Sequence, residues 1–382
     1  AGRTWVAEAT ELELSAQDGG APAVGVMAGF FAVDSGSFSL FTGSFSLRGF
    51  SEGERQLRLF SRDRLGNEEA ARSETVILDR SAPLTALARA GTSFGDFISS
   101  RTVLSLSAQD RGAIPAGTAS TRYRIDGGAL ANEPLSFSLD GDEGRRLVEF
   151  GSVDRVGNEE TLSSATLILD KTAPITAAAI LGPRFAAPPG DAQAVGGPLF
   201  IASHTRLSLS AADPGAFPSG VARVLAAIDA AAFAEVDAPI ALGGEGARFA
   251  AFKAVDRVAN EEEQKCFSVS VDSTAPTTRL SFIGAYFLNF NGSGAQPEQA
   301  DVFISATGKV VLTAEDPVSS GTASGLRELR YRVNGGGFTA YTAPFALAPG
   351  LHIVEWFSTD RVLNEEPLAS RRIAVDAQAP IT

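Results

Sequence analysis

One nonapeptide occurs four times in this chain of 382 residues, and it limits the possible folds more than any other feature. It reads SRDRLGNEE from Ser61, SVDRVGNEE from Ser152, AVDRVANEE from Ala254 and STDRVLNEE from Ser358. Successive copies are 91 to 104 residues apart, which is the length of one ordinary domain. Because repetition at such a period is typical of domain arrays, we predict four tandem copies of one fold.

Two further aspartates accompany each nonapeptide at nearly constant spacing. One ends a strand-like segment 43 to 45 residues before the aspartate of the nonapeptide, and the other begins a linker 16 residues after it. We call the three types strand-end, turn and linker aspartates. The strand-end set is Asp18, Asp110, Asp213 and Asp316, the turn set is Asp63, Asp154, Asp256 and Asp360, and the linker set is Asp79, Asp170, Asp272 and Asp376.

The linkers LDRSAP, LDKTAP, VDSTAP and VDAQAP place the predicted boundaries. Repeat 1 covers residues 1–80 without its first strand, repeat 2 covers 81–171, repeat 3 covers 172–273, repeat 4 covers 274–377, and 378–382 start a following repeat or linker. Repeats 3 and 4 each contain an inserted segment centred on Gly and Pro, which predicts a long surface hairpin. We expect the chain to be a window of a longer array; alternatively, the tail of one subunit supplies the missing strand of the next.

Hydrophobic residues alternate with polar ones within each repeat, as in TVLSLSAQD at residues 102–110. The dipeptides Asp126-Gly127 and Asn334-Gly335 follow such segments and are typical of two-residue hairpin turns. Each repeat offers several short strands and no helical period, which predicts an all-β chain of four two-sheet antiparallel β-sandwiches in a linear array.

Composition excludes several classes of function. The formal charge of −13 and the presence of only four lysines argue against nucleic acid or an anionic membrane as partner. Only two histidines occur, His204 and His352, and neither has a partner at a zinc-ligand spacing. The single cysteine, Cys266, alternates with serines along a strand, and we expect it to be a buried small side chain.

The segment 331–366, YRVNGGGFTAYTAPFALAPGLHIVEWFSTDRVLNEE, followed by VDAQAP, resembles the bacterial immunoglobulin-like tandem repeats of secreted and surface proteins, the type catalogued under a spirochaete outer-membrane protein. Repeat 2 matches this pattern well, whereas repeat 3 lacks the glycine turn and the tyrosines. The resemblance implies that the four sandwiches are immunoglobulin-like and that the protein is exported and either extracellular or at the cell surface. It also implies calcium at interdomain joints, because related adhesin repeats hold it there.

Two interpretations of the nonapeptide stay open. In the first, the turn aspartate lies on the core side and accepts hydrogen bonds from the turn's backbone, while the asparagine takes the left-handed conformation. In the second, Asp110, Asp154, Glu160 and Asp170, with their equivalents in other repeats, hold calcium. Register places Asp170 away from the core. The first interpretation leads us to expect no metal, no cofactor and no catalytic residue.

The sequence therefore predicts a noncatalytic structural or adhesive repeat protein of a bacterial surface, extracellular fibre or matrix, acting as a stalk or a self-assembling filament subunit. The expected partner is the protein itself or neighbouring repeats of a longer chain. The alternative is a spacer or ligand-binding module of a larger secreted hydrolase. The inserted hairpins supply candidates for lateral contacts, or else for caps on each sandwich: Phe185, Phe200, Phe282, Phe287 and Phe290.

Overall fold

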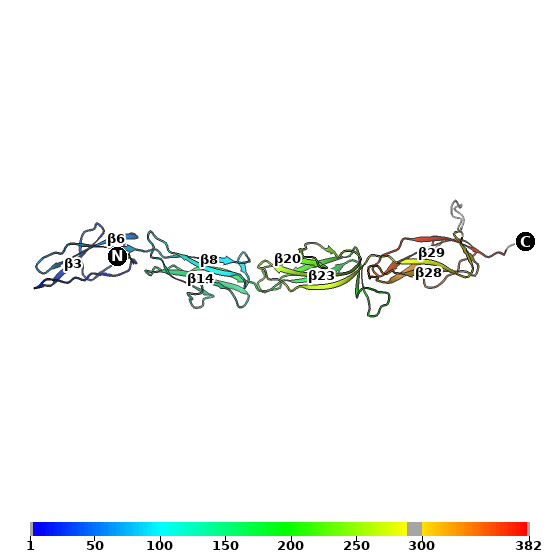
Figure 1. The fold of residues 1–382 in the computed structure, drawn as a ribbon, viewed down its shortest axis with the longest axis horizontal. Helices are drawn as coiled ribbons and strands as arrows, with labels where there is room; N and C mark the ends of the chain where they lie inside the picture. The colour runs from blue at the N-terminus through cyan, green and yellow to red at the C-terminus, as the bar shows by residue number, and fades with distance from the viewer. Residues whose placement is uncertain (1–2, 289–299, 380–382) are drawn as a thin grey trace. The chain divides into compact units, whose positions relative to one another are not determined.

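The structure is a computed structural model that describes residues 3–288 and 300–379, and all its regular elements are strands (Figure 1). Within these residues there is no helix long and apolar enough to cross a membrane. The chain forms two compact units. Unit 1 contains residues 1–172, 215–219 and 257–260, and unit 2 contains residues 173–214, 220–256 and 261–382.

Repeat 1 contains two sheets. The larger sheet has the strand order β1-β7-β6-β3-β4, and the smaller pairs β2 with β5. The strands are β1 (Thr4–Val6), β2 (Leu12–Glu13), β3 (Val26–Val33), β4 (Ser39–Leu40), β5 (Ser44–Phe45), β6 (Gly53–Asp63) and β7 (Arg72–Leu78).

Repeat 2 has the strand orders β12-β14-β15-β10-β9 and β13-β11-β8 in its two sheets. The strands are β8 (Leu84–Ala90), β9 (Ser93–Phe94), β10 (Phe97–Ile98), β11 (Val103–Gln109), β12 (Thr118–Ile125), β13 (Ser136–Ser138), β14 (Gly144–Asp154) and β15 (Ser163–Leu169).

Repeats 3 and 4 repeat this arrangement with sheets β17-β18-β24-β23-β20-β21 and β26-β27-β32-β31-β29-β30, each facing a smaller sheet, β16-β19-β22 or β25-β28. The strands of repeat 3 are β16 (Ile175–Leu181), β17 (Arg184–Ala186), β18 (Leu199–Ala202), β19 (Arg206–Ala212), β20 (Val221–Ile228), β21 (Ala234–Glu235), β22 (Ile240–Ala241), β23 (Gly246–Asp256) and β24 (Lys265–Asp272). Those of repeat 4 are β25 (Thr277–Ile283), β26 (Tyr286–Leu288), β27 (Val302–Ser305), β28 (Lys309–Glu315), β29 (Leu326–Val333), β30 (Thr339–Ala340), β31 (Gly350–Asp360) and β32 (Ala369–Asp376).

One parallel strand pair occurs in every repeat, in addition to the predicted antiparallel pairs. The pairs are β1 with β7, β10 with β15, β18 with β24, and β27 with β32. In repeat 2 the last strand, β15, is paired with β10 in parallel on one side and with β14 in antiparallel on the other. The linker aspartate therefore follows a strand that is paired on both sides.

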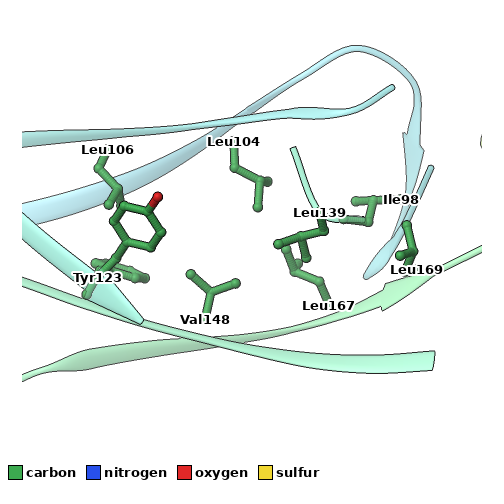
Figure 2. Packing of buried hydrophobic residues seen from close by; sticks show 9 residues of the cluster. Ile98, Leu104, Leu106, Tyr123, Leu139, Val148, Leu167 and Leu169 are labelled. Carbon is green, nitrogen blue, oxygen red and sulfur yellow. The ribbon is translucent and has the colours of Figure 1, made fainter. Parts of the chain in front are cut away.

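Each repeat encloses its own hydrophobic core, as the alternating pattern predicts. In repeat 2, Leu104 projects from one sheet towards Tyr123, Val148 and Leu167 of the other, and all four side chains are buried (Figure 2). A fully buried leucine of this kind stabilises a fold by about 1.5–3 kcal/mol. Corresponding buried clusters lie in the other three repeats.

The predicted hairpin turns are confirmed, because Asp126 and Asn334 have φ angles of 51° and 53° and are each followed by a glycine with φ of 72°. The expectation for Cys266 is wrong, since this side chain is exposed. Its neighbours Phe267 and Val269 pack into the core instead, so the alternation has the opposite phase from the one predicted.

Candidate metal centre at the joints between repeats

The turn aspartates accept hydrogen bonds from the turn that follows them. Oδ1 of Asp154 accepts from the backbone N–H groups of Val156 and Asn158 at 2.9 and 2.8 Å, and Oδ2 accepts from Nδ2 of Asn158 at 2.7 Å. Asp360 makes the same three contacts with Val362 and Asn364. The predicted capped turn is confirmed. It forms because a carboxylate at a strand end is the nearest acceptor for the free amides of a tight turn.

The left-handed residue of this turn is the one before the asparagine, so the prediction that placed it at the asparagine is wrong. The φ angles are 89° at Gly66, 91° at Gly157, 67° at Ala259 and 71° at Leu363. Glycine is the residue best suited to such angles, and the alanine and leucine copies carry backbone strain. The asparagine is required for its side-chain amide.

That amide connects two successive repeats. Nδ2 of Asn158 in repeat 2 donates both to Oδ2 of Asp154 and, at 3.0 Å, to the backbone oxygen of the linker residue Asp79. Asn364 makes the equivalent contact with the backbone oxygen of Asp272 at 2.9 Å. An amide has two N–H donors, and both are used here, one within the turn and one across the joint.

The linker aspartates also bind the following repeat. Oδ2 of Asp79 accepts from the backbone N–H of Ala116 at 2.6 Å, and Oδ2 of Asp272 accepts from that of Ser324 at 2.6 Å. The next amide along, that of Gly117, donates to the strand-end residue Asp110 at 2.6 Å. Linker and strand-end carboxylates are therefore held side by side by adjacent backbone amides.

Three carboxylates consequently meet at each of two joints. Joint 1–2 contains Asp79, Asp110 and Asp154 within unit 1, and joint 3–4 contains Asp272, Asp316 and Asp360 within unit 2. In each set one oxygen of every residue lies within 4.8 Å of the others. Two unit charges at that separation repel by about 3.5 kcal/mol at the effective dielectric constant of a protein site.

Burial makes this repulsion more costly. The linker and turn aspartates of both joints are buried, and the strand-end aspartates are half-buried. Burial raises the pKa of Asp79 to about 6, and the neighbouring Asp110 charge adds to the increase. Burial likewise raises the pKa of Asp316 to about 7, with further repulsion from Asp272 and Asp360.

Joint 3–4 also contains buried oxygens without a hydrogen bond among the described residues. These are Oδ1 of Asp316 and Oε1 of Glu245. The charge of Glu245 contributes to the raised pKa of Asp316. A buried acceptor that lacks a donor costs free energy unless a proton or a cation satisfies it.

The donor set fits calcium. Ca²⁺ is a hard cation that takes six to eight oxygens at about 2.3–2.6 Å, so two oxygens on one ion are separated by at most about 5 Å. The 4.8 Å limit within each carboxylate set satisfies this condition. Asp79, Asp110 and Asp154 would hold the ion in joint 1–2, and Asp272, Asp316 and Asp360 in joint 3–4.

The structure groups the predicted calcium candidates differently from the sequence. Asp110 and Asp154 lie together, but Glu160 accepts hydrogen bonds within repeat 2, from the backbone N–H groups of Thr85 and Ser152 at 3.0 Å each. Asp170, which register places away from the core of repeat 2, is fully buried, and its Oδ2 accepts from the backbone N–H of Ser219 at 2.7 Å. The covering residues come from the next segment of the chain, which the register within one repeat cannot show.

The inserted hairpin of repeat 3 contacts repeat 4. Its Val195 forms a backbone bridge with Ala323, with N–O distances of 2.8 and 2.9 Å in the two directions. Asp191 forms an ion pair with Arg361, and the Arg361 guanidinium lies 4.7 Å from the centre of the Phe185 ring. The insertion therefore joins two repeats of unit 2.

The five predicted contact phenylalanines divide into different roles. Phe200 is fully buried in a cluster with Ala202 and Val362, and Phe185 packs against that cluster. Phe282 packs on the core of repeat 4, as the capping interpretation predicts. Phe287 is 66% exposed, and Phe290 lies outside the described residues. Phe200 is paired with Ser270 of β24, which leads into the joint, and Phe185 is paired with Phe200, so both rings reach the next repeat instead of a lateral surface.

No protein-family model matches this chain, and no curated protein matches it. Solved structures with a similar fold include a tetra-tandem repeat in the extending region of a large adhesion protein, at 16% identity over 92% of each chain with a TM-score of 0.29. Sidekick-1 immunoglobulin domains 1–5 match at 11% identity over 98% of this chain and 78% of that one, TM-score 0.29. Clostridium thermocellum CbhA fibronectin(III)-like modules match at 11% identity over 44% and 90%, TM-score 0.27. The fold assignment rests on the strands and cores described above.

Proposed function

We propose that this chain is a noncatalytic structural or adhesive repeat protein of a bacterial surface or extracellular matrix, in which successive immunoglobulin-like repeats act as a stalk. The observation that carries the proposal is the recurrence of one joint. Asn158 and Asn364 make the same pair of side-chain hydrogen bonds at two places in the chain. Contacts that recur at successive joints are typical of a structural array, whereas an enzyme needs only one catalytic site.

We also propose that each of the two carboxylate sets binds one calcium ion when the protein is in a calcium-containing medium. The ion would offset the repulsion among three carboxylates that have no ion pair with Lys or Arg in the described residues. Its effect would be to fix the angle between two repeats. Extracellular modules bind calcium weakly, with dissociation constants of about 10⁻⁴–10⁻³ M, so millimolar calcium is the relevant condition.

Thermal unfolding tests the calcium proposal. Millimolar calcium is about 10 times a dissociation constant of about 10⁻⁴ M and would stabilise a joint by about 1.4 kcal/mol, which raises the Tm by several degrees. We expect this increase to disappear with chelator and to be reduced in the variant Asp316→Asn. The control is Asp140→Asn, which changes an exposed carboxylate of repeat 2 outside both sets. An equal Tm in calcium and in chelator would contradict calcium binding at the joints.

Small-angle scattering tests the stalk itself. We expect an extended particle whose maximum dimension does not depend on catalytic ligands or nucleic acid. The double variant Asn158→Ala, Asn364→Ala should broaden the distribution of interatomic distances, because both joints lose their amide contacts. A compact particle in solution would contradict the stalk.

A further inference from the structure

One turn of each repeat is closed by a side chain that binds the long strand beside it. In repeat 1, Oδ1 of Asp34 accepts from the backbone N–H of Gln56 at 3.0 Å, and Oδ2 accepts from Nη1 of Arg55 at 2.9 Å. Nε of Arg55 also donates to the backbone oxygen of Ser51 at 2.8 Å. We call these contacts the hairpin cap. Repeats 2 and 3 have the same ion pair, between Asp126 and Arg146 at 2.8 Å and between Asp229 and Arg248 at 3.3 Å.

Repeat 4 has a different pair of residues in its hairpin cap. Asn334 stands in place of the aspartate and His352 in place of the arginine, although the φ angle of 53° at Asn334 lies within the 51–57° of the other three turns. Oδ1 of Asn334 accepts from the backbone N–H of Ile353 at 2.9 Å, and its Nδ2 lies 3.1 Å from Nδ1 of His352. Nε2 of His352 lies 2.8 Å from the backbone oxygen of Ala348. The connections of the cap are therefore kept without an ion pair.

The directions of these hydrogen bonds determine where the His352 ring carries its proton. Because the backbone N–H of Ile353 is a donor, the group of Asn334 that faces it is the carbonyl oxygen, and the NH2 group faces His352. An NH2 group only donates, so Nδ1 of His352 is the acceptor and Nε2 carries the proton that is donated to the carbonyl of Ala348. Every donor in this cap therefore meets an acceptor only when the ring is neutral.

A second proton on His352 disrupts this arrangement. It would lie on Nδ1, so that an N–H group would face the NH2 group of Asn334, and turning the amide over would place that NH2 group against the N–H of Ile353 instead. In the unfolded chain water accepts the hydrogen bond of the added proton, so protonation favours unfolding. Histidine gains its charge between about pH 8 and pH 5, so the stability is lost as the pH falls through this range.

The caps of repeats 1–3 do not respond in this range. An aspartate side chain loses its proton near about pH 4 and an arginine keeps its own, so an ion pair of the two stays charged between about pH 5 and pH 8. In repeat 1 the amide of Gln56 and the guanidinium of Arg55 lower the pKa of Asp34 further. The difference between His352 and the three arginines therefore makes repeat 4 the acid-sensitive member of the set.

Within the part of the chain that the structure describes, no charged side chain binds His352. Its two hydrogen-bond partners are neutral, and the ring forms no ion pair there. The segments 334–337 and 345–351 beside it contain no charged residue. The charged residues of the smaller sheet alternate with its core residues and so lie on its outer face. Those of the neighbouring strands are occupied or turned away: Arg372 binds Asp301, Arg371 is exposed, Glu355 binds Arg332, and Asp376 accepts from the backbone N–H of Gln378.

We propose that the contact between His352 and Asn334 is an acid-sensitive element that weakens repeat 4 as the medium becomes acidic, while repeats 1–3 keep their caps. The atom that takes up the proton is Nδ1 of His352, and the contact that is lost is the one to the Asn334 amide. This inference goes beyond the proposed function and does not depend on calcium, because neither residue belongs to a carboxylate set. It makes the strength of one repeat in the stalk respond to the pH of its surroundings.

The variant Asn334→Asp tests the proposal, because it replaces the NH2 group by an oxygen that accepts from a protonated Nδ1. The turn tolerates aspartate, which stands at this position in the other three repeats. Urea unfolding of the full chain is followed by Trp356 in the core of repeat 4, in a Trp5→Phe background, at about pH 7.5 and pH 5.5. The unfolding constant of the variant is divided by that of the parent, so the contributions of Asp316 and other groups cancel. We expect this ratio to fall about tenfold at the lower pH, because the parent loses a hydrogen bond and the variant gains a charged one.

Two controls identify the titrating group. In a His352→Gln chain the same exchange at Asn334 should give a ratio that does not depend on pH, because glutamine takes up no proton. The change His204→Gln removes the other histidine, which is exposed in the turn after β18, and should leave the tenfold fall intact. A ratio that is equal at both pH values, or a fall that persists in His352→Gln or disappears in His204→Gln, would overturn the proposal. The calcium-dependent Tm and the scattering experiment would be unaffected in that case, so the proposals fail separately.

Discussion

Joints 1–2 and 3–4 have the same polar contacts but differ in the apolar and hairpin contacts beside them. Both have three carboxylates, an asparagine amide that reaches the linker carbonyl, and an amide that binds the linker carboxylate. Joint 1–2 leaves an open groove of about 670 Å³ beside Val156 and Asn158. In joint 3–4 the hairpin of repeat 3 contacts repeat 4, and the corresponding Val362 is buried.

The comparison shows that the polar contacts and the additional apolar contacts have different roles. The polar set places the second repeat on the first, because each hydrogen bond requires one position and one direction. Joint 3–4 has two further contacts, which enlarge the area between the repeats and lie away from the carboxylate set. They are the apolar contact of Phe200 with Val362 and the ion pair of Asp191 with Arg361. Joint 1–2 has in their place a hydrogen bond from Nε1 of Trp5 to the backbone oxygen of Ile114 at 3.2 Å. We therefore expect joint 1–2 to bend more readily than joint 3–4.

The largest effect should come from Phe200→Ala. This change removes a fully buried ring that belongs both to repeat 3 and to the joint, and the free energy of unfolding should fall by about 3–5 kcal/mol. The matched change at joint 1–2 is Trp5→Ala, which should cost only about 1–2 kcal/mol, since that ring is half-buried. Calorimetry measures the free energy of unfolding of both variants, and equal losses would contradict the proposed difference between the joints.

The next effect concerns the bridging amides. Asn158→Ala and Asn364→Ala should each cost about 1–3 kcal/mol, because buried acceptors lose their donor. The fluorescence of the two tryptophans reports on the two joints separately, since Trp5 lies in repeat 1 and Trp356 in repeat 4. In variants that keep one tryptophan, Asn158→Ala should uncouple unfolding of repeat 1 from that of repeat 2. Asn364→Ala should leave repeats 3 and 4 coupled, and uncoupling there would show that the hairpin contributes little.

The pH dependence should be larger at joint 3–4 in chelator. The pKa of Asp316 is raised from 3.8 to about 7, chiefly by burial. A raised pKa means that the folded state holds the proton more tightly than the unfolded state, so this stabilisation is complete below pH 3.8 and is lost as the pH rises through about 7. Denaturant titrations followed by Trp356 fluorescence should show this loss. Asp316→Asn should flatten the profile, whereas a profile unchanged by that variant would assign the loss to another group.

The smallest effect concerns the left-handed residue of the turn. Leu363→Gly should stabilise repeat 4 by up to about 1 kcal/mol, because glycine adopts a φ of 71° without strain. Gly157→Ala should destabilise repeat 2 by a similar amount. Opposite signs for the two variants are the expected result. A loss of stability in Leu363→Gly would mean that the half-exposed leucine contributes more by packing than it costs in strain.

The all-β architecture and the hairpin turns could be predicted from the sequence because they depend on local patterns. Alternation along TVLSLSAQD gives β11, and Asp126-Gly127 gives the hairpin turn that follows β12. The acceptor role of Asp154 could be predicted for the same reason, since its donors lie two and four residues away.

The joints could not be predicted because their members come from different repeats. Asp79 and Asp110 are adjacent in space only when one repeat is placed on the next, and register within a repeat places Asp170 away from the core without showing what covers it. One signal was present in the sequence. Asparagine occupies the same position in all four nonapeptides while the residue before it varies among Gly, Ala and Leu, which indicates a side-chain contact and not a backbone requirement.

The parallel pairing of β27 with β32 bears on how repeat 4 responds to tension. A pull on the two linkers of that repeat would slide these strands past each other along their length. Their backbone hydrogen bonds would then be loaded together in shear, whereas a hairpin pulled from its open end unzips one bond at a time. Four residues of β27 take part in this pairing and two of β10 do so in repeat 2, so repeat 2 should yield at the lower force.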